Sequence, residues 1–93
     1  MSKSATTIEL ASMLDLRAAK PLADQLLALR GSSVKLDASK VEKLGAQCVQ
    51  VFLSAGRTWE ADGSDIEVVD PSPAFLAALG VMGLSTDQLS TGN

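Results

Sequence analysis

Histidine and tyrosine are both absent from the 93-residue chain. Histidine is the commonest general base near neutral pH and the commonest protein ligand for metal ions, so its absence removes the usual route to both functions. A glycine-rich phosphate loop is also missing, because the nearest candidate, Gly31–Ser33, lacks the further glycines and the lysine of such loops. We therefore expect a protein that is not an enzyme and that binds no cofactor or metal ion.

Cysteine and long apolar runs are scarce as well. The single cysteine, Cys48, cannot form a disulfide within the chain, which is compatible with a reducing cytoplasm. The first residues, MSKSATT, lack the apolar run of a signal peptide. No window approaches the roughly 18 apolar residues that cross a bilayer. We expect a cytoplasmic protein without a membrane-inserted segment.

Positive charge and aromatic side chains are too sparse to indicate nucleic-acid binding. The 8 Lys and Arg residues are scattered through a chain of net charge −3, whereas nucleic-acid binders usually carry a basic patch. The chain has 1 Trp and 2 Phe, and two of these three lie on one helical stripe, so no platform for stacking bases is evident.

Hydrophobic residues make up 46% of the chain and charged residues 20%, which is typical of a globular protein rather than a disordered one. We interpret residues 1–93 as a single domain with a core from about residue 6 to 84. We expect a loose N-terminal end and a mobile tail at 85–93, in which only Leu89 is a candidate for packing. Strands are predicted at 6–11, 33–37 and 65–69, a turn at 12–17, and helices at 19–30, 45–60 and 73–82.

Each predicted strand alternates apolar residues with polar ones, among them Glu9, Lys35 and Glu67. Parallel strands covered on both faces read instead as continuous apolar runs. The alternating order of strands and helices favours parallel pairing with right-handed crossovers. The predicted fold class is therefore α/β, with a mostly parallel sheet of about three to four strands and helices on one face.

Caps and glycines mark the first and third helices. In the first helix, Pro21 is expected in the first turn, where a missing N–H costs little, and Gly31 ends the helix. In the third, Ser72 is the N-cap and Pro73 the first helical residue. The expected inward-facing residues are Ala19, Leu22, Leu26 and Leu29 on the first helix and Phe75, Leu76, Leu79 and Met82 on the third.

The chain is organised around residues 34–56, where a strand and a polar turn lead into the second helix. One apolar stripe of this helix is made by Leu44, Cys48, Val51, Phe52, Ala55 and Trp59. We expect Phe52 and Trp59 to be buried, and we interpret Cys48 as a buried small hydrophobe rather than a reactive thiol. A second strip, made by Ala46, Val49 and Leu53, lies beside the first. This strip either extends the core or stays partly exposed to meet a partner.

Three carboxylates, Asp62, Asp65 and Glu67, lie close together in the sequence. Their spacing and the position of the neighbouring glycine do not follow the twelve-residue loop pattern of a calcium site. We therefore interpret them as a solvated edge.

Several segments follow one another in a familiar order: Leu14-Asp15, Val34–Ser39 with Val41, the turn into the second helix, and Ile66–Val69. In the order and spacing of these segments, over about residues 6–84, the chain resembles the STAS domain of bacterial anti-sigma-factor antagonists. The resemblance implies a sheet with helices on one side, in agreement with the alternation above. Typical members also carry an extra N-terminal strand, for which this chain has almost no room.

The turn into the second helix departs from the family pattern. STAS proteins that switch partners carry an Asp-Ser-Ser-Gly-like sequence at this turn. The first serine of that sequence is phosphorylated by the partner kinase. In register, Gly45-Ala46-Gln47-Cys48 takes these four positions, so Ala46 stands where the phosphoacceptor would be and no phosphoacceptor is expected. Ser39 and Ser54 are the nearby hydroxyls; we interpret Ser39 as the end of a strand and Ser54 as facing water, with a regulatory role as the alternative.

The resemblance implies a non-enzymatic protein-interaction module in bacterial signal transduction. Its expected partner is a kinase with an ATPase-type domain: a chemotaxis histidine kinase is preferred, and an anti-sigma factor is the other form. The alternative is a structural STAS subunit of a lipid-transport ATPase complex, and a third reading is a nucleotide- or lipid-binding domain acting alone. The expected partner-binding residues are Asp15, Gly45, Ala46, Gln47, Val49 and Leu53.

Overall fold

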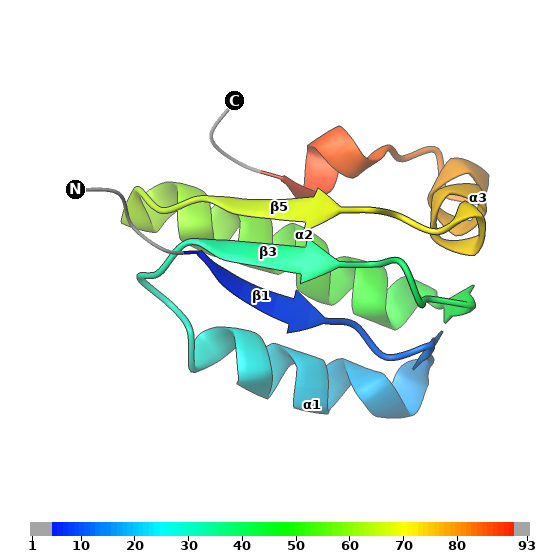
Figure 1. Ribbon diagram of the computed structural model, residues 1–93, viewed down its shortest axis with the longest axis horizontal. Coiled ribbons are helices and arrows are strands. Elements are labelled where there is room, and N and C mark those ends of the chain that lie inside the picture. The colour runs from blue at the N-terminus through cyan, green and yellow to red at the C-terminus, as the bar shows by residue number, and fades with distance from the viewer. Residues whose placement is uncertain (1–4, 91–93) are drawn as a thin grey trace.

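The computed structural model describes residues 5–90 and shows a three-stranded parallel sheet. The strands β1 (Thr6–Glu9), β3 (Val34–Asp37) and β5 (Ile66–Val69) lie in the order β1-β3-β5 (Figure 1). The register aligns Ile8 with Leu36 and Leu36 with Val68, so the inward-facing apolar residues of neighbouring strands share one row. The expected α/β fold with a mostly parallel sheet is confirmed.

A second, very small sheet was not expected from the sequence. It pairs β2 (Met13–Leu14) with β4 (Lys43–Leu44), again in parallel. Each strand has only two residues, too few for a period-2 pattern to be detected. The pair lies beyond the C-terminal ends of β1 and β3, where it joins the segments that lead into the first two helices (Figure 1).

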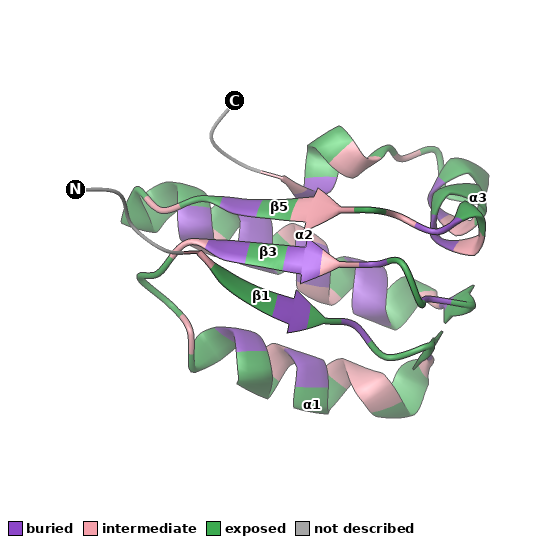
Figure 2. Cartoon of the chain, in the orientation of Figure 1, coloured by how far each residue is buried: buried purple, intermediate pink, exposed green. Residues whose placement is uncertain are grey.

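Helices α1 (Leu16–Leu27) and α2 (Ala46–Asp62) pack against each other and cover one face of the sheet (Figure 1). The opposite face carries Thr7, Lys35 and Glu67, which are neighbours in the register and exposed. Buried and exposed residues alternate most clearly along β3, the central strand (Figure 2). Helix α3 (Pro73–Val81) lies at the end of the sheet beside β4 (Figure 1).

The core lies between the sheet and the two covering helices. Phe52 and Trp59 are 0% and 1% exposed, which confirms their predicted burial. The ring of Phe52 meets that of Phe75 from α3, with centroids 6.2 Å apart and planes inclined at 56°. Helix α2 supplies two of the three aromatic side chains, and through them it contacts the sheet and α3 in one continuous core.

The predicted limits of α1 were wrong by about three residues at both ends. Asp15 is the N-cap, and its carboxylate accepts hydrogen bonds from the N–H groups of Arg17 and Ala18 at 3.0 and 3.3 Å. Pro21 therefore lies inside the helix rather than in its first turn. Because proline has no backbone N–H, it cannot donate the hydrogen bond to the carbonyl one turn earlier in the helix. The packing of the helix must offset this cost.

Helix α3 begins as predicted, but its inward face is narrower than predicted. Ser72 caps it and Pro73 follows, and the Ser72 hydroxyl also donates to the carbonyl of Val41 at 2.6 Å. Phe75 and Leu79 are buried, whereas Leu76 and Met82 are 47% and 36% exposed, so their assignment to the core was wrong. The helix meets the domain along one side only, which buries a single i, i+4 pair.

Residues 85–90, which fall in the segment expected to be a tail, form the short 3₁₀ helix η1 (Thr86–Leu89). Ser85 and Gln88 form a reciprocal capping box, and Leu89 is fully buried. The Ser90 hydroxyl accepts from the N–H of Val68 on the outer strand of the sheet at 3.3 Å. The expectations for residues 1–4 and 91–93 lie outside the described residues.

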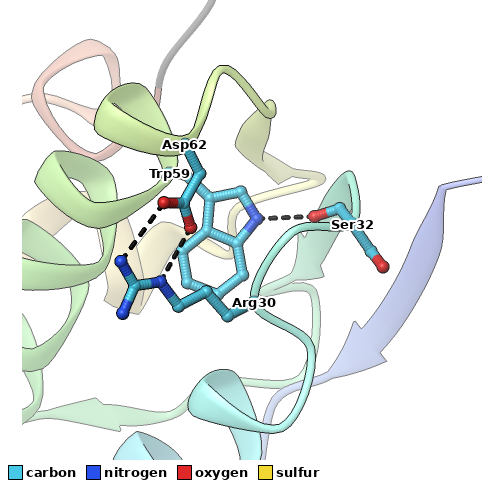
Figure 3. Close-up of polar contacts among 4 residues, drawn as sticks. All are labelled: Arg30, Ser32, Trp59 and Asp62. Carbon is cyan, nitrogen blue, oxygen red and sulfur yellow. Dashed lines mark hydrogen bonds and ion pairs between the residues drawn. The ribbon is translucent and has the colours of Figure 1, made fainter.

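Polar contacts fasten the turn after α1 to the last turns of α2 (Figure 3). Arg30 forms a bidentate ion pair with the Asp62 carboxylate: Nε donates to Oδ2 at 2.8 Å and Nη2 donates to Oδ1 at 3.2 Å. Trp59 Nε1 donates to the carbonyl of Ser32 at 2.6 Å. The indole ring therefore packs in the core, and its N–H holds the turn after α1 by a hydrogen bond.

Replacing the central aromatic tests the packing of this core. We expect Phe52→Ala to lower the free energy of unfolding by about 3–5 kcal/mol, because the fully buried ring leaves a cavity behind. Urea denaturation measures the change. The exposed control Thr7→Ala should shift stability by less than about 0.5 kcal/mol. A loss below about 1 kcal/mol for Phe52→Ala would mean that α2 faces the sheet differently.

The Arg30–Asp62 pair predicts a specific acid dependence. The hydrogen bond from Arg30 lowers the pKa of Asp62, so this pair stabilises the fold above the ordinary aspartate pKa of about 3.9 and stops doing so as pH falls through the lowered value. We expect Asp62→Asn to flatten the fall in melting temperature below about pH 5. Arg30→Gln should flatten it equally, since either change removes the pair. Slopes matching the unmodified chain in both variants would contradict the assignment.

Candidate functional site

The N-termini of α1 and α2 lie together at the end of the sheet where β1 and β3 finish (Figure 1). The β2–β4 pairing holds them, and the N–H of Gly45 extends it by donating to the carbonyl of Leu14 at 2.8 Å. Asp15 and Gly45, about thirty residues apart in the sequence, are thereby adjacent: a Cβ on Gly45 would lie 3.9 Å from the Asp15 Cα. The structure thus brings together these two predicted partner-binding residues.

Asp15 is already engaged within the chain. Its side chain caps α1, and its backbone carbonyl accepts a bond from the Cys48 thiol at 3.4 Å. The residue is half-buried; its carboxylate holds the start of α1, and only its backbone carbonyl joins that start to α2. Its clearest role is to position the neighbouring surface.

Gly45 is the N-cap of α2 and supplies no side-chain acceptor. Its backbone is extended, at φ −94° and ψ 163°, a conformation open to any residue. A Cβ would meet the Leu14 carbonyl oxygen at 3.4 Å, so a side chain fits at ordinary contact. Neither conformation nor space requires glycine here, and its effect is to present the first N–H groups of α2 without a covering side chain.

The second apolar strip of α2 divides into three environments. Ala46, the first helical residue, is exposed, as is Gln47 beside it. Val49 is only 2% exposed and belongs to the core, so the expectation that it stays partly exposed was wrong. Leu53 is half-buried and packs against the core. The reason is that α2 packs against both α1 and the sheet, which makes its buried arc wider than one stripe.

Cys48 lies beneath this surface and is fully buried, as predicted. Burial raises the pKa of its thiol, and the nearby charge of Asp15 raises it further. A thiol held protonated and hidden from solvent is a poor nucleophile. Its function here is structural, since it fills the space under the start of α2 and donates to Asp15.

Two exposed apolar residues beside the site were missed in the sequence. Met13 on β2 is 49% exposed, and Leu16, the first residue of α1, is 71% exposed. Both lie in residues 12–17, the segment interpreted as a turn. The only signal in the sequence was that this turn contains more apolar residues than turns usually do. We call Met13, Leu16, Gly45, Ala46 and Gln47 the α2-terminal surface.

The serines near this site carry no sign of a special environment. Ser39 is exposed at the end of β3, and its N–H donates to the Asp37 carboxylate at 2.9 Å, a bond that lowers the pKa of Asp37. Ser54 is exposed on α2. It lines a hollow of about 410 Å³ between α1 and α2, floored by Leu26, Ala55 and Trp59.

Within residues 5–90, no group of three or more Asp, Glu, Cys or His side chains is arranged to hold a metal ion. Asp62, one of the clustered carboxylates, is paired with Arg30 instead. In the same part of the chain no helix has the length and apolar character needed to cross a membrane.

A parallel sheet with helices across one face, and a helix N-terminus presented beside the strand ends, is consistent with a STAS-like fold. Residues 1–91 match the family described as "Mlab, STAS domain", and the chain belongs to this family. STAS domains are protein-interaction modules and are generally not enzymes. Comparison with curated proteins and with solved structures gave no match.

Proposed function

We propose that this protein is a cytoplasmic interaction module of bacterial signal transduction that binds a kinase with an ATPase-type domain. A chemotaxis histidine kinase is the preferred partner and an anti-sigma factor the other form. Membership of the STAS family supports a binding role. The resemblance in the order of strands and helices supports this class of partner.

One observation carries the proposal: the five residues of the α2-terminal surface are uncharged and all but Gly45 are exposed, with the charged Arg17 and Lys43 at its edge. Met13, Leu16 and Ala46 are exposed apolar residues, and Gln47 adds a neutral amide. Depletion of charge is characteristic of the centre of protein interfaces. The surface also coincides with the place where the family resemblance implies partner contact.

Ala46 gives the proposed interaction its particular character. It is exposed where the resemblance implies a phosphoacceptor, and alanine has no hydroxyl. We propose that the protein is therefore constitutively competent to bind, without the usual serine phosphorylation switch.

The alternative is a structural subunit of a lipid-transport ATPase complex, which would use the same surface. Affinity purification from a native lysate, followed by mass spectrometry, separates the two. Recovery of a kinase supports the proposal, whereas recovery of a transporter ATPase supports the alternative.

The lack of a phosphorylation switch predicts the outcome of a direct assay. After incubation with the recovered kinase and ATP, the intact mass of this protein should be unchanged. Ala46→Ser, which restores a hydroxyl at the family position, is the comparison variant. A stoichiometric phosphate adduct on the unmodified chain would contradict the prediction and direct attention to Ser39 or Ser54.

A carboxylate at Ala46 should separate binding from stability. In Ala46→Asp the new charge lies at the positive end of the α2 dipole and should stabilise the fold by about 0.3–1 kcal/mol. Against an apolar partner the same charge must lose its water, at a cost of about 1–3 kcal/mol or more. We expect an equal or higher melting temperature and an affinity reduced by at least about tenfold.

The control for affinity is Ala28→Asp, the same exchange at the exposed C-cap of α1, where the negative end of the dipole should lower the melting temperature instead of raising it. It should leave the affinity unchanged. Unfolding of Ala46→Asp would place Ala46 in the core, and an unaltered affinity would place the interface elsewhere.

A further inference from the structure

The sheet is covered at one edge and open at the other. At the β5 edge, η1 packs against the strand, and the Ser90 hydroxyl accepts from the N–H of Val68 at 3.3 Å. At the opposite edge β1 is the last strand, and no other strand within residues 5–90 pairs with its outer side (Figure 1). The fold therefore leaves one edge of the sheet available for a further strand.

The hydrogen bonds of β1 show which of its backbone groups face outward. The N–H groups of Thr6 and Leu10 donate to carbonyls on the β3 side, at 2.9 and 3.0 Å. Because backbone groups alternate in direction along a strand, the N–H and C=O groups of Thr7 and Glu9 point away from β3. Neither outward N–H meets an acceptor within residues 5–90. Unpaired groups at this spacing are a template for an extended backbone.

A hollow of about 210 Å³ lies beside this edge, between the end of β1 and α1. Its floor is apolar and buried, made by Leu10, Leu14 and Leu22. The residues that complete its lining are Glu9, Ala11, Ala18, Pro21 and Gln25. None of the lining residues belongs to β3 or α2, so the hollow opens at the β1 edge. A strand added to β1 would turn alternate side chains toward the helix side of the sheet, where the hollow can receive an apolar one.

Charge plays a small part in selecting what binds here. Glu9 is the only charged residue that lines the hollow, and its carboxylate already pairs with Lys40 at 3.0 Å. Backbone groups and an apolar floor therefore dominate the edge. An acidic residue directly opposite Glu9 on an added strand would be disfavoured, because like charges that face each other across a sheet repel.

The position of α1 decides between a single segment and a second copy of the chain. Helix α1 lines the hollow, and it runs along the β1 side of the molecule (Figure 1). Paired strands lie about 4.8 Å apart, whereas a helix is about 10 Å across. Two copies joined edge to edge by their β1 strands would therefore bring the helices on that face into overlap. An extended segment without such a helix fits.

The open edge is continuous with the α2-terminal surface. Ala11 and Leu14 line the hollow, and Met13 of the α2-terminal surface lies between them in the sequence. One protein that covers the α2-terminal surface can therefore extend a segment along β1.

We propose that the outer edge of β1 binds an extended segment of the protein partner, which adds a strand to the sheet and places an apolar side chain in the hollow. The segment matches the four residues of β1 and pairs through the backbone groups of Thr7 and Glu9. This proposal rests on the protein-binding role proposed above, but it does not depend on the partner being a kinase.

Thr7→Pro is the test variant. Proline removes the outward N–H of residue 7 and leaves the bonds between β1 and β3 in place, and edge strands tolerate proline where the N–H faces solvent. The variant should therefore fold. The matched control is Thr7→Ala, which removes the same side chain and keeps the N–H.

The probe is the protein that the unmodified full-length chain recovers from a native lysate, expressed and purified, and titrated by calorimetry. We expect Thr7→Pro to weaken its binding by about tenfold or more and Thr7→Ala to change it by less than about twofold. Gln25→Phe, which fills the mouth of the hollow, should weaken binding as well. Its control is Gln50→Phe, the same exchange at an exposed position of α2, which should not.

Hydrogen exchange followed by NMR tests the same pairing without a substitution. In the free chain the amides of Thr7 and Glu9 should exchange rapidly, and addition of the recovered protein should slow both by about tenfold or more. Leu10, whose N–H is bonded within the sheet, is the internal reference and should be protected in both states. Unchanged exchange at Thr7 and Glu9 in the complex would overturn the proposal even if Thr7→Pro failed to fold.

The outcomes separate this proposal from the proposed function. A kinase whose affinity falls with both Ala46→Asp and Thr7→Pro supports both proposals, and a transporter ATPase with the same pattern supports only this one. A kinase affected by Ala46→Asp alone overturns this proposal and leaves the function intact. Recovery of no partner overturns both.

Three further results would overturn the proposal by assigning the edge to another occupant or chemistry. Equal losses for Thr7→Pro and Thr7→Ala would show that a side chain, not the backbone, makes the contact. A dimer in analytical ultracentrifugation that Thr7→Pro dissociates would show that the edge pairs two copies. Slow exchange of Thr7 and Glu9 in the free monomer would show that the chain covers its own edge.

Discussion

The arrangement of the two helix starts that form the α2-terminal surface depends on the short parallel pairing of β2 with β4. Two residues on each side, extended by the bond from Gly45 to Leu14, fix where α1 and α2 begin relative to each other. The Asp15 cap and the Cys48 thiol reinforce this junction from within. Because the α2-terminal surface is assembled from both helix starts, its shape follows from these few backbone contacts rather than from any one side chain.

The larger elements follow from local sequence patterns, which is why they could be predicted. The three main strands alternate, Ser72-Pro73 is an unambiguous helix start, and the aromatic stripe of α2 recurs at helical spacing. The β2–β4 pair could not be predicted in this way, since each strand is defined only by a partner about thirty residues away. The start of α1 is ambiguous in the sequence, because Asp15 and Pro21 are competing start signals; the structure follows the Asp15 cap, and packing lets the helix tolerate an interior proline.

The site shows the same division between local and long-range information. Spacing and family resemblance placed Gly45, Ala46 and Gln47 at the start of α2, where the structure has them. The width of a helix's buried face depends on how many other elements pack against it. The sequence of the helix itself does not carry this information. Helix α2 has two broad neighbours and buries Val49, whereas α3 has one and leaves Leu76 outside. Met13 and Leu16 belong to the α2-terminal surface only because the structure places the starts of α1 and α2 side by side.

The position of Trp59 has a spectroscopic consequence. The chain has one tryptophan and no tyrosine, so its intrinsic fluorescence above about 300 nm comes from a single indole buried near the far end of α2 and bonded to Ser32. Thirteen residues of helix, about 20 Å, separate Trp59 from Ala46. The emission therefore reports whether the fold is intact, and the indole is too far from Ala46 to sense a ligand bound there directly. Tryptophan emission from a protein added as a candidate partner can be followed against this steady background.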